Sequence, residues 1–146
     1  MARPRGLAID SFLALQIPNS SQLITWRIGE LGFDMHLSGE VPSEIGRALK
    51  EQGTEITRGR DPLSIDLWAV HPGGRSILDS VEKGLGLGAD ALAFSRDVLL
   101  RYGNMSSATV MFVLQQIAVR AQSGQTGCAM SFGPGLTAET MLFHAA

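Results

Sequence analysis

The amino-acid sequence predicts an α/β fold in which helices pack on a mixed sheet. Segments with strand and helix patterns occur in the order strands, helix, strand, helices, two strands, which favours helices on the faces of one sheet. The clearest strand is the apolar run Asp66–His71, which stops abruptly at Pro72–Gly74. A second indication is the alternation of apolar and polar residues on either side of residues 29–32, which is the spacing of a hairpin.

The composition is that of one globular domain with a real core. The chain has 146 residues, of which 45% are hydrophobic and 18% charged. Its net charge of -2 provides no general attraction to nucleic acid or to an anionic membrane, and every long apolar stretch is interrupted by charge or glycine, so none should span a bilayer. The only cysteine, Cys128, excludes an internal disulfide and suits a reducing cytoplasm. The basic start Met1–Arg5 precedes an apolar run that Asp10 and Ser11 interrupt, which argues against a signal peptide.

Six strands are expected, each bounded by turn-forming residues. They are Leu7–Ile17, Leu23–Ile28, Phe33–Ser38, Asp66–His71, Gly127–Phe132 and Thr137–His144. In the second hairpin strand, side chains on one face are Phe33, Met35 and Leu37, because successive residues of a strand point to opposite faces. A tight corner at Gly133–Gly135 should join the last two strands.

Four helices are expected between these strands. They cover Pro42–Gly53, Ser76–Lys83 with a start near Gly74, about Ala89–Arg101, and Ser106–Arg120. Pro42 suits a first turn and Gly53 a helix end, so the polar stretch Thr54–Pro62 is predicted to be a surface loop. The last helix carries five consecutive apolar residues, Val110–Leu114, and a helix that is apolar on nearly every side should be buried on nearly every side.

Two glycine-containing motifs imitate known sites. Gly84–Ala89 fits a loose dinucleotide-binding pattern, but it follows a helix rather than a strand, so a helix end and loop is the favoured interpretation. Ala129–Gly133 loosely resembles the nucleophile elbow of hydrolases, but no helix follows Ser131. Neither motif has the structural context that its chemistry requires.

The cysteine and two of the histidines give no site of their own. Cys128 lies in an apolar strand, where cysteine usually behaves as an inert small hydrophobe, although a nucleophile is the alternative. His36 and His144 have no neighbours at ligand spacing, so no metal site is predicted.

His71 and Asn104 are the candidate catalytic pair. His71 ends a buried strand and Asn104 precedes a buried helix, and ligands of open α/β sheets bind beyond the carboxyl ends of strands. Both side chains can aim N–H donors at an oxygen that becomes negative during reaction. Taken singly, a core histidine and a helix cap are the alternative interpretations.

Three motifs in a fixed order make the chain resemble a known family. They are His71–Gly74, Tyr102–Ser107 and Phe132–Thr140, which read His-Pro-Gly-Gly, Tyr-Gly-Asn-Met-Ser-Ser and Phe-Gly-Pro-Gly-Leu-Thr-Ala-Glu-Thr. Together they resemble the C-terminal part of type III polyketide synthases, the chalcone and stilbene synthase family, and the likeness extends over Trp26–Pro42. The resemblance implies half of a thiolase-like fold, with residues 1–146 forming the C-terminal domain, roughly the last two-fifths of a family member.

The resemblance also implies a reaction. Family members load an acyl group from coenzyme A onto a cysteine, decarboxylate malonyl-coenzyme A, condense the resulting enolate with the acyl thioester, and cyclise the product. His71 and Asn104 match the family's histidine and asparagine. The nucleophilic cysteine and the cations that hold coenzyme A belong to an N-terminal domain, which is the implied partner. A homo-oligomer is expected, no cofactor beyond the coenzyme A thioester substrates is implied, and this chain alone should be inactive.

Other positions match family residues around the substrate. They are Phe33, Met35, Leu37, Ser76, Ser106, Phe132, Gly133 and Pro134. Met35 replaces a bulky aromatic residue of the plant enzymes, and because methionine is flexible, a long or variable acyl starter is expected. Ser131 stands where the family usually has glycine. Core packing is the alternative interpretation for each of these positions.

Two other interpretations stay open. The β-ketoacyl synthase III group uses the same residue types, but resembles His-Gln-Ala-Asn and Gly-Asn-Thr-Ser where this chain has His71–Gly74 and Gly103–Ser106. Alternatively, the chain is a non-catalytic interaction or regulatory module derived from the fold. Such a half should expose an apolar face that normally packs on its partner.

Overall fold

The computed structural model describes residues 6–146, so the basic start that bears on the signal-peptide expectation lies outside the described residues. The strands are β1 (Leu7–Gln16), β2 (Ile24–Ile28), β3 (Phe33–Leu37), β4 (Leu67–Val70), β5 (Thr126–Gly133) and β6 (Thr137–Ala145). The helices are α1 (Val41–Ile56), α2 (Arg75–Leu85), α3 (Ala93–Tyr102) and α4 (Thr109–Arg120), with short 3-10 turns η1 (Pro62–Ser64) and η2 (Ser106–Ala108).

The main sheet is mixed, as the sequence predicts. Its strand order is β1-β6-β5-β4, with β4 and β5 parallel and the other two pairs antiparallel. The parallel pair needs a crossover, and α2, α3 and α4 supply it. Strands β2 and β3 form a separate antiparallel hairpin.

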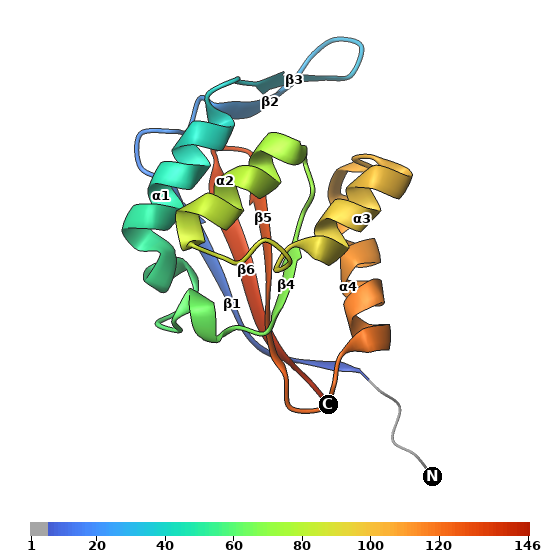
Figure 1. Ribbon diagram of the computed structural model, residues 1–146. Coiled ribbons are helices and arrows are strands. Elements are labelled where there is room, and N and C mark those ends of the chain that lie inside the picture. Colours follow the sequence, from blue (N-terminus) through green and yellow to red (C-terminus); the bar gives the residue numbers. More distant parts are fainter. Residues whose placement is uncertain (1–5) are drawn as a thin grey trace.

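Helices cover both faces of this sheet (Figure 1). Trp68 and Val70 of β4 belong to the core cluster under α1 and α2, whereas Leu67 and Ala69 belong to the cluster under α3 and α4. Alternate residues of one short strand therefore serve two cores, which explains why β4 is buried throughout.

The end of α1 differs from the prediction. The helix continues through Thr54–Ile56, which the sequence assigns to a loop. Gly53 does not end it, because this glycine packs against α2, where a Cβ atom would lie 2.9 Å from Leu85 Cδ2. Glycine at position 53 allows α1 and α2 to pack closely. The spacing of apolar residues in the sequence does not distinguish a glycine with this packing role from one that ends a helix. The backbone does leave helical geometry at Gln52, one residue earlier.

The start of α3 also differs from the prediction. Residues 89–92 form turns, in which the Ala93 N–H donates to Asp90 O, so the helix begins at Ala93.

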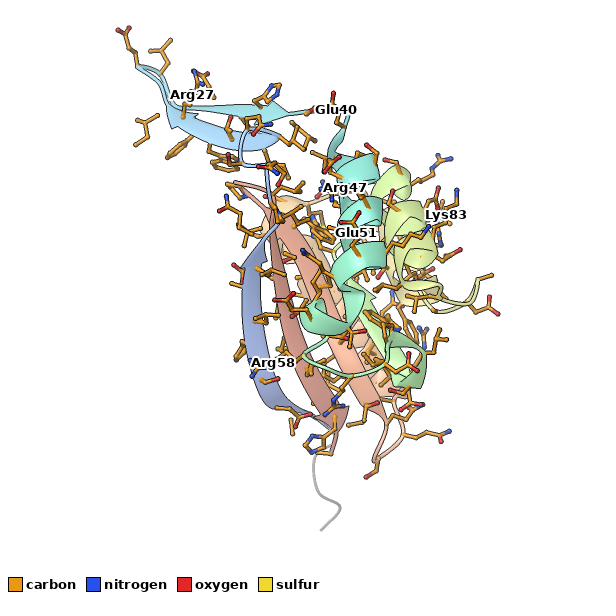
Figure 2. All side chains as sticks on the ribbon, turned by 90° about the vertical axis from the view of Figure 1, so that its left-hand side faces the viewer. Arg27, Glu40, Arg47, Glu51, Arg58 and Lys83 are labelled. Carbon is orange, nitrogen blue, oxygen red and sulfur yellow. The ribbon has the colours of Figure 1, made fainter. Side chains whose placement is uncertain are left out.

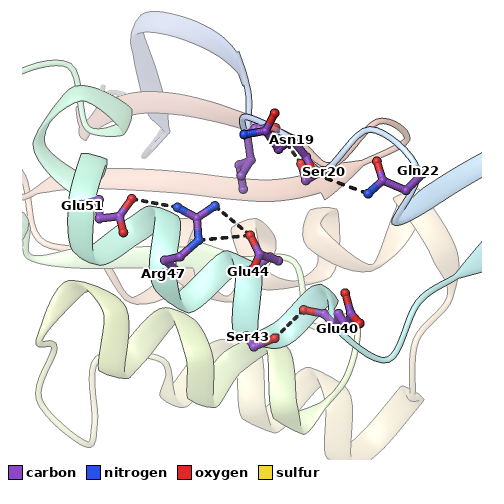
Figure 3. A network of polar contacts seen from close by, with 9 residues as sticks. Asn19, Ser20, Gln22, Glu40, Ser43, Glu44, Arg47 and Glu51 are labelled. Atoms are coloured by element: carbon purple, nitrogen blue, oxygen red, sulfur yellow. Dashed lines mark hydrogen bonds and ion pairs between the residues drawn. The ribbon is translucent and has the colours of Figure 1, made fainter.

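The outward face of α1 is charged. Arg47 lies between Glu44 and Glu51, with Nη2 2.7 Å from Glu44 Oε2 and Nη1 2.8 Å from Glu51 Oε2 (Figure 3). Such exposed ion pairs add little stability, but they identify this side of the molecule as one that faces solvent.

The prediction that the last helix is buried on nearly every side is wrong for this chain. Only one stripe of α4 is buried, at Thr109, Val113 and Ile117. Met111 and Val119 are 61% and 69% exposed. The helix therefore presents apolar side chains outward.

The β2–β3 hairpin projects beyond the sheet on the side away from α1 and α2 (Figure 2). Its register pairs Trp26 with Met35 and Ile28 with Phe33, so these side chains lie on one face together with Leu37. All five are exposed, and the rings of Trp26 and Phe33 pack with their centroids 5.7 Å apart. The hairpin thus carries an uncovered apolar face.

Candidate active site

The candidate site lies at the carboxyl ends of β4 and β5, which meet at one edge because the strands are parallel. His71 directly follows β4, and the corner Phe132–Pro134 closes β5. The loop from β4 to α2, the end of α3 and the start of α4 gather in the same upper part of the molecule as the hairpin (Figure 1).

The backbone at His71 is held from both sides. The His71 N–H donates to Met130 O of β5 at 2.7 Å. On the other side β4 is the edge of the sheet, and the Val70 N–H donates instead to Oγ of the fully buried Ser95 in α3, at 3.1 Å. The imidazole lies against Gly73, where a Cβ atom would be 3.7 Å from His71 Cδ2. The strand end therefore positions a half-buried imidazole at the sheet edge.

Partial burial lowers the pKa of His71 below its ordinary value of 6.5, because desolvation disfavours the imidazolium ion. At neutral pH the ring is therefore neutral in this chain. A neutral imidazole has one N–H donor and one acceptor nitrogen, so it can donate a hydrogen bond to a substrate oxygen.

The lowered pKa of His71 predicts a pH dependence of stability. Below pH 6.5, the ordinary histidine pKa, His71 takes up a proton in the unfolded chain but resists protonation in the folded chain. The contribution of neutral His71 to the free energy of unfolding is therefore full above about pH 6.5 and declines as the pH falls towards the pKa of the folded state. The free energy of unfolding in urea should therefore fall more between pH 7.5 and 5.5 in the wild type than in His71→Gln. The exposed His36, changed to Gln, is the control and should behave like the wild type. An equal loss in wild type and His71→Gln would contradict the prediction.

Asn104 lies beside the same glycine. Its Nδ2 donates to Gly73 O at 3.1 Å, and its Oδ1 accepts from the Ser106 N–H at 2.9 Å. The second amide hydrogen has no acceptor among the described residues. The His71 imidazole and the Asn104 amide thus both lie beside Gly73.

The remaining candidate residues fall into two groups. Ser106 is linked to Asn104 by its N–H, and Ser76 lies exposed in the first turn of α2, three residues after Gly73. Phe33, Met35 and Leu37 lie on the projecting hairpin and are 68%, 60% and 59% exposed.

The corner after β5 ties the hairpin to the site. The Gly135 N–H, just beyond Phe132, Gly133 and Pro134, donates to Ile24 O at the base of the hairpin at 2.7 Å. The structure therefore connects the two groups through the backbone, and the described residues leave the apolar hairpin face open.

Three residues near the site are not among those predicted from the sequence. Trp26 shares the apolar face with Met35, and the alternation of residues 24–28 was a signal that could have placed it there. Ser95 and Thr109 are fully buried hydroxyl residues that hold the backbone beside His71 and Asn104. A single serine or threonine has no sequence pattern that predicts a hydrogen bond to the backbone of a distant element.

A cavity lies between the start of α2 and α3. It has a volume of about 610 Å³ and is lined by Gly74, Arg75, Arg96, Leu99 and Leu100. Arg96 is paired with Asp79 and Glu82. Neither His71 nor Asn104 lines this cavity.

The residues of the misleading motifs have ordinary structural roles. Cys128 is buried in β5, and burial raises the pKa of its thiol to about 12, so it is a protonated core residue. Residues 84–89 follow α2, and Ser131 lies within β5 with no helix after it. Among residues 6–146 no cluster of histidine, cysteine or acidic side chains is arranged to hold a metal ion. The helices of this part of the chain are also too short or too polar to cross a membrane.

Comparison with known proteins agrees with the motifs. A family model for the C-terminal domain of chalcone and stilbene synthases matches residues 8–146. The relatives include the alpha-pyrone synthesis polyketide synthase-like Pks18 of Mycobacterium tuberculosis and of Mycobacterium bovis, each 36% identical over 145 residues. The match covers 96% of this chain and 37% of each relative.

A solved structure shares the fold. PKS-I from the brown alga Ectocarpus siliculosus superposes with a TM-score of 0.83 at 36% identity, over 96% of this chain and 40% of that protein. This chain therefore spans well under half the length of its relatives.

Proposed function

The chain belongs to the chalcone and stilbene synthase family as its C-terminal domain, and we propose that it supplies the histidine and asparagine of a type III polyketide synthase active site. The observation that carries the proposal is the meeting of His71 and Asn104 at Gly73. The reaction is the decarboxylative condensation of an acyl-coenzyme A starter with malonyl-coenzyme A. A complete site needs a second domain that brings the nucleophilic cysteine.

The two donors suit the decarboxylation step. When the bond to the malonyl carboxylate breaks, CO₂ leaves and the electron pair moves onto the thioester oxygen as an enolate. N–H groups of His71 and Asn104 stabilise that oxygen. Because an amide and a neutral imidazole are weak acids, they do so without protonating the carbanion that must attack the acyl group. One such preorganised donor is worth about 3–4 kcal/mol.

The charge state of His71 should change when the partner domain binds. In this chain its pKa is lowered because burial is not compensated by an anion. A cysteine thiolate contributed by the partner would favour the imidazolium ion and raise the pKa again. The same residue would then stabilise the thiolate before acyl loading and act as a neutral donor afterwards.

An uncovered apolar surface is available for the partner domain. Ile9 and Phe12 of β1 are 57% and 64% exposed, and they lie opposite Phe143 and Met141 on the face of the sheet that α4 also covers. The exposed side of α4 adds Met111 and Val119, and we call these four residues, Ile9, Phe12, Met111 and Val119, the open residues. Exposed apolar surface is typical of interfaces, and we propose that the cysteine-bearing domain packs against these residues.

Mixing tests the proposal directly. This chain and the N-terminal domain of a complete type III polyketide synthase are produced separately and assayed with acyl-coenzyme A and malonyl-coenzyme A. Neither should form product alone, and the mixture should do so. The control is the N-terminal domain with its nucleophilic cysteine changed to alanine, which should bind but give no product. Product from this chain alone would refute the proposal. Binding without turnover by the intact pair would favour the interaction module.

The hairpin should set the range of acyl starters. We propose that its apolar face forms a wall of the substrate cavity, in which flexible Met35 admits long chains. Met35→Phe should lower kcat/KM for a long-chain acyl-coenzyme A by about tenfold or more while sparing a short starter, since small volume changes in an apolar pocket are worth about 1–3 kcal/mol. The assembled enzyme is assayed with starters of increasing length. His36→Phe, on the opposite face of β3, is the matched control, and an equal effect of the two variants would contradict this role.

A further inference from the structure

The turn that carries Asn104 is closed by one buried hydroxyl group. Thr109 is fully buried at the start of α4. Its Oγ1 accepts from the Met105 N–H at 2.8 Å and donates to Ser106 O at 2.7 Å. The hydroxyl thus spans the turn from one side to the other and uses both its donor and its acceptor capacity.

The turn is strained without such support. Ser106 has φ of 62°, the left-handed region that costs a residue with a side chain about 1–2 kcal/mol. This conformation directs the Ser106 N–H at Asn104 Oδ1, 2.9 Å away. Thr109 Oγ1 is itself 3.5 Å from Asn104 Oδ1, but its single hydrogen points to the much closer Ser106 carbonyl. The link from Thr109 to Asn104 therefore runs through Ser106.

The link decides which end of the carboxamide faces the site. The Ser106 N–H can pair only with the oxygen of Asn104, so the nitrogen points towards Gly73 O, to which it donates at 3.1 Å. A rotation of the amide by 180° would place N–H against N–H at Ser106 and oxygen against oxygen at Gly73. It would also present an oxygen to the developing enolate, which repels it.

We propose that Thr109 is a positioning residue that fixes the orientation of the Asn104 carboxamide for catalysis. This proposal rests on the proposed role of Asn104. Thr109 does not itself reach the site, since it is buried and its hydroxyl is used within the turn. A residue that merely capped α4 would support the helix without influencing the amide of Asn104.

The test compares Thr109→Val, which keeps the shape and removes the hydroxyl, with Thr109→Ser, which keeps the hydroxyl. In this chain the side-chain NH₂ signals of Asn104 are followed by NMR together with their exchange with solvent. T109V should shift these signals and speed their exchange by about tenfold or more, and T109S should retain the wild-type pattern. In the assembled enzyme T109V should lower kcat for malonyl-coenzyme A decarboxylation about tenfold with KM within twofold, and T109S should restore it.

The NMR comparison and the activity assay test different claims. A folded T109V whose Asn104 side-chain signals and exchange match the wild type overturns the proposal, whatever its activity. If the assembled wild-type enzyme is inactive, the proposed function fails, and the NMR comparison still decides whether Thr109 orients the amide. Should T109V not fold, Thr109→Ala removes the hydroxyl without placing a methyl group against the Met105 N–H, and the same comparison applies.

Discussion

Replacing Gly127 by alanine should remove a large part of the stability of this chain. Gly127 lies in β5 between Leu67 of β4 and Phe143 of β6. A Cβ atom there would fall 2.1 Å from Phe143 Cζ and less than 3.0 Å from two further ring atoms. The ring cannot yield cheaply, because it is fully buried in the core under α3 and α4. Overpacking typically costs about 1–3 kcal/mol and occasionally more, and we expect at least about 3 kcal/mol here.

Urea unfolding measures this effect. Gly88→Ala is the matched control, because a Cβ atom at exposed Gly88 meets nothing within 4 Å, and its stability should stay within about 0.5 kcal/mol of the wild type. Gly127→Ala combined with Phe143→Leu should recover part of the loss, since the smaller side chain vacates the space. An unchanged unfolding midpoint for Gly127→Ala alone would show that the ring can move aside.

The close contact of Gly127 with Phe143 also shows what sequence patterns convey. The strands and their mixed sheet were predictable, because alternation and runs of apolar residues report how many faces of a strand are buried. Nothing in the sequence indicates that Gly127 faces an aromatic ring. Gly53 is a second example. A glycine at the end of an apolar period predicts a helix end, but Gly53 lies within α1 and allows this helix to pack closely on α2. Contacts between elements decide such cases.

The wrong prediction for α4 has a different physical cause. Its apolar pattern predicts burial on nearly every side, whereas Met111 and Val119 are exposed in this chain. A hydrophobic pattern records the surroundings in which a helix functions, including surfaces covered by another domain. The exposure of apolar side chains on α4 therefore supports the proposed partner domain, which would cover them.

The candidate site was predictable only in part. The identities of His71 and Asn104 came from the motifs around them, but their shared contact with Gly73 depends on how α3 and α4 return to the end of β4. The hydroxyls of Ser95 and Thr109 act through single hydrogen bonds between residues that no local pattern relates. Trp26 is the exception, since strand alternation places it on the face of Met35.

Changing Asn104 to aspartate should have the largest effect on catalysis. Aspartate matches asparagine in shape, and its carboxylate can still accept from the Ser106 N–H. However, it has no N–H for Gly73 O or for the enolate, and it brings a negative charge to the point where negative charge develops. Removing one preorganised donor costs about 3–4 kcal/mol, or about 10² to 10³ in kcat, and the added charge should increase the loss.

Malonyl-coenzyme A decarboxylation by the assembled enzyme isolates this step, because it needs no acyl transfer from the starter. Asn104→Asp should lose more activity than Asn104→Ala, which removes the donor without adding charge. The order of the activities, with wild type above Asn104→Ala and Asn104→Ala above Asn104→Asp, is the decisive result. The amide stabilises the enolate oxygen, alanine neither stabilises nor repels it, and the carboxylate repels it. If Asn104→Asp retained more activity than Asn104→Ala, the side chain would serve the turn through Ser106, and the role of enolate donor would fall to His71 alone.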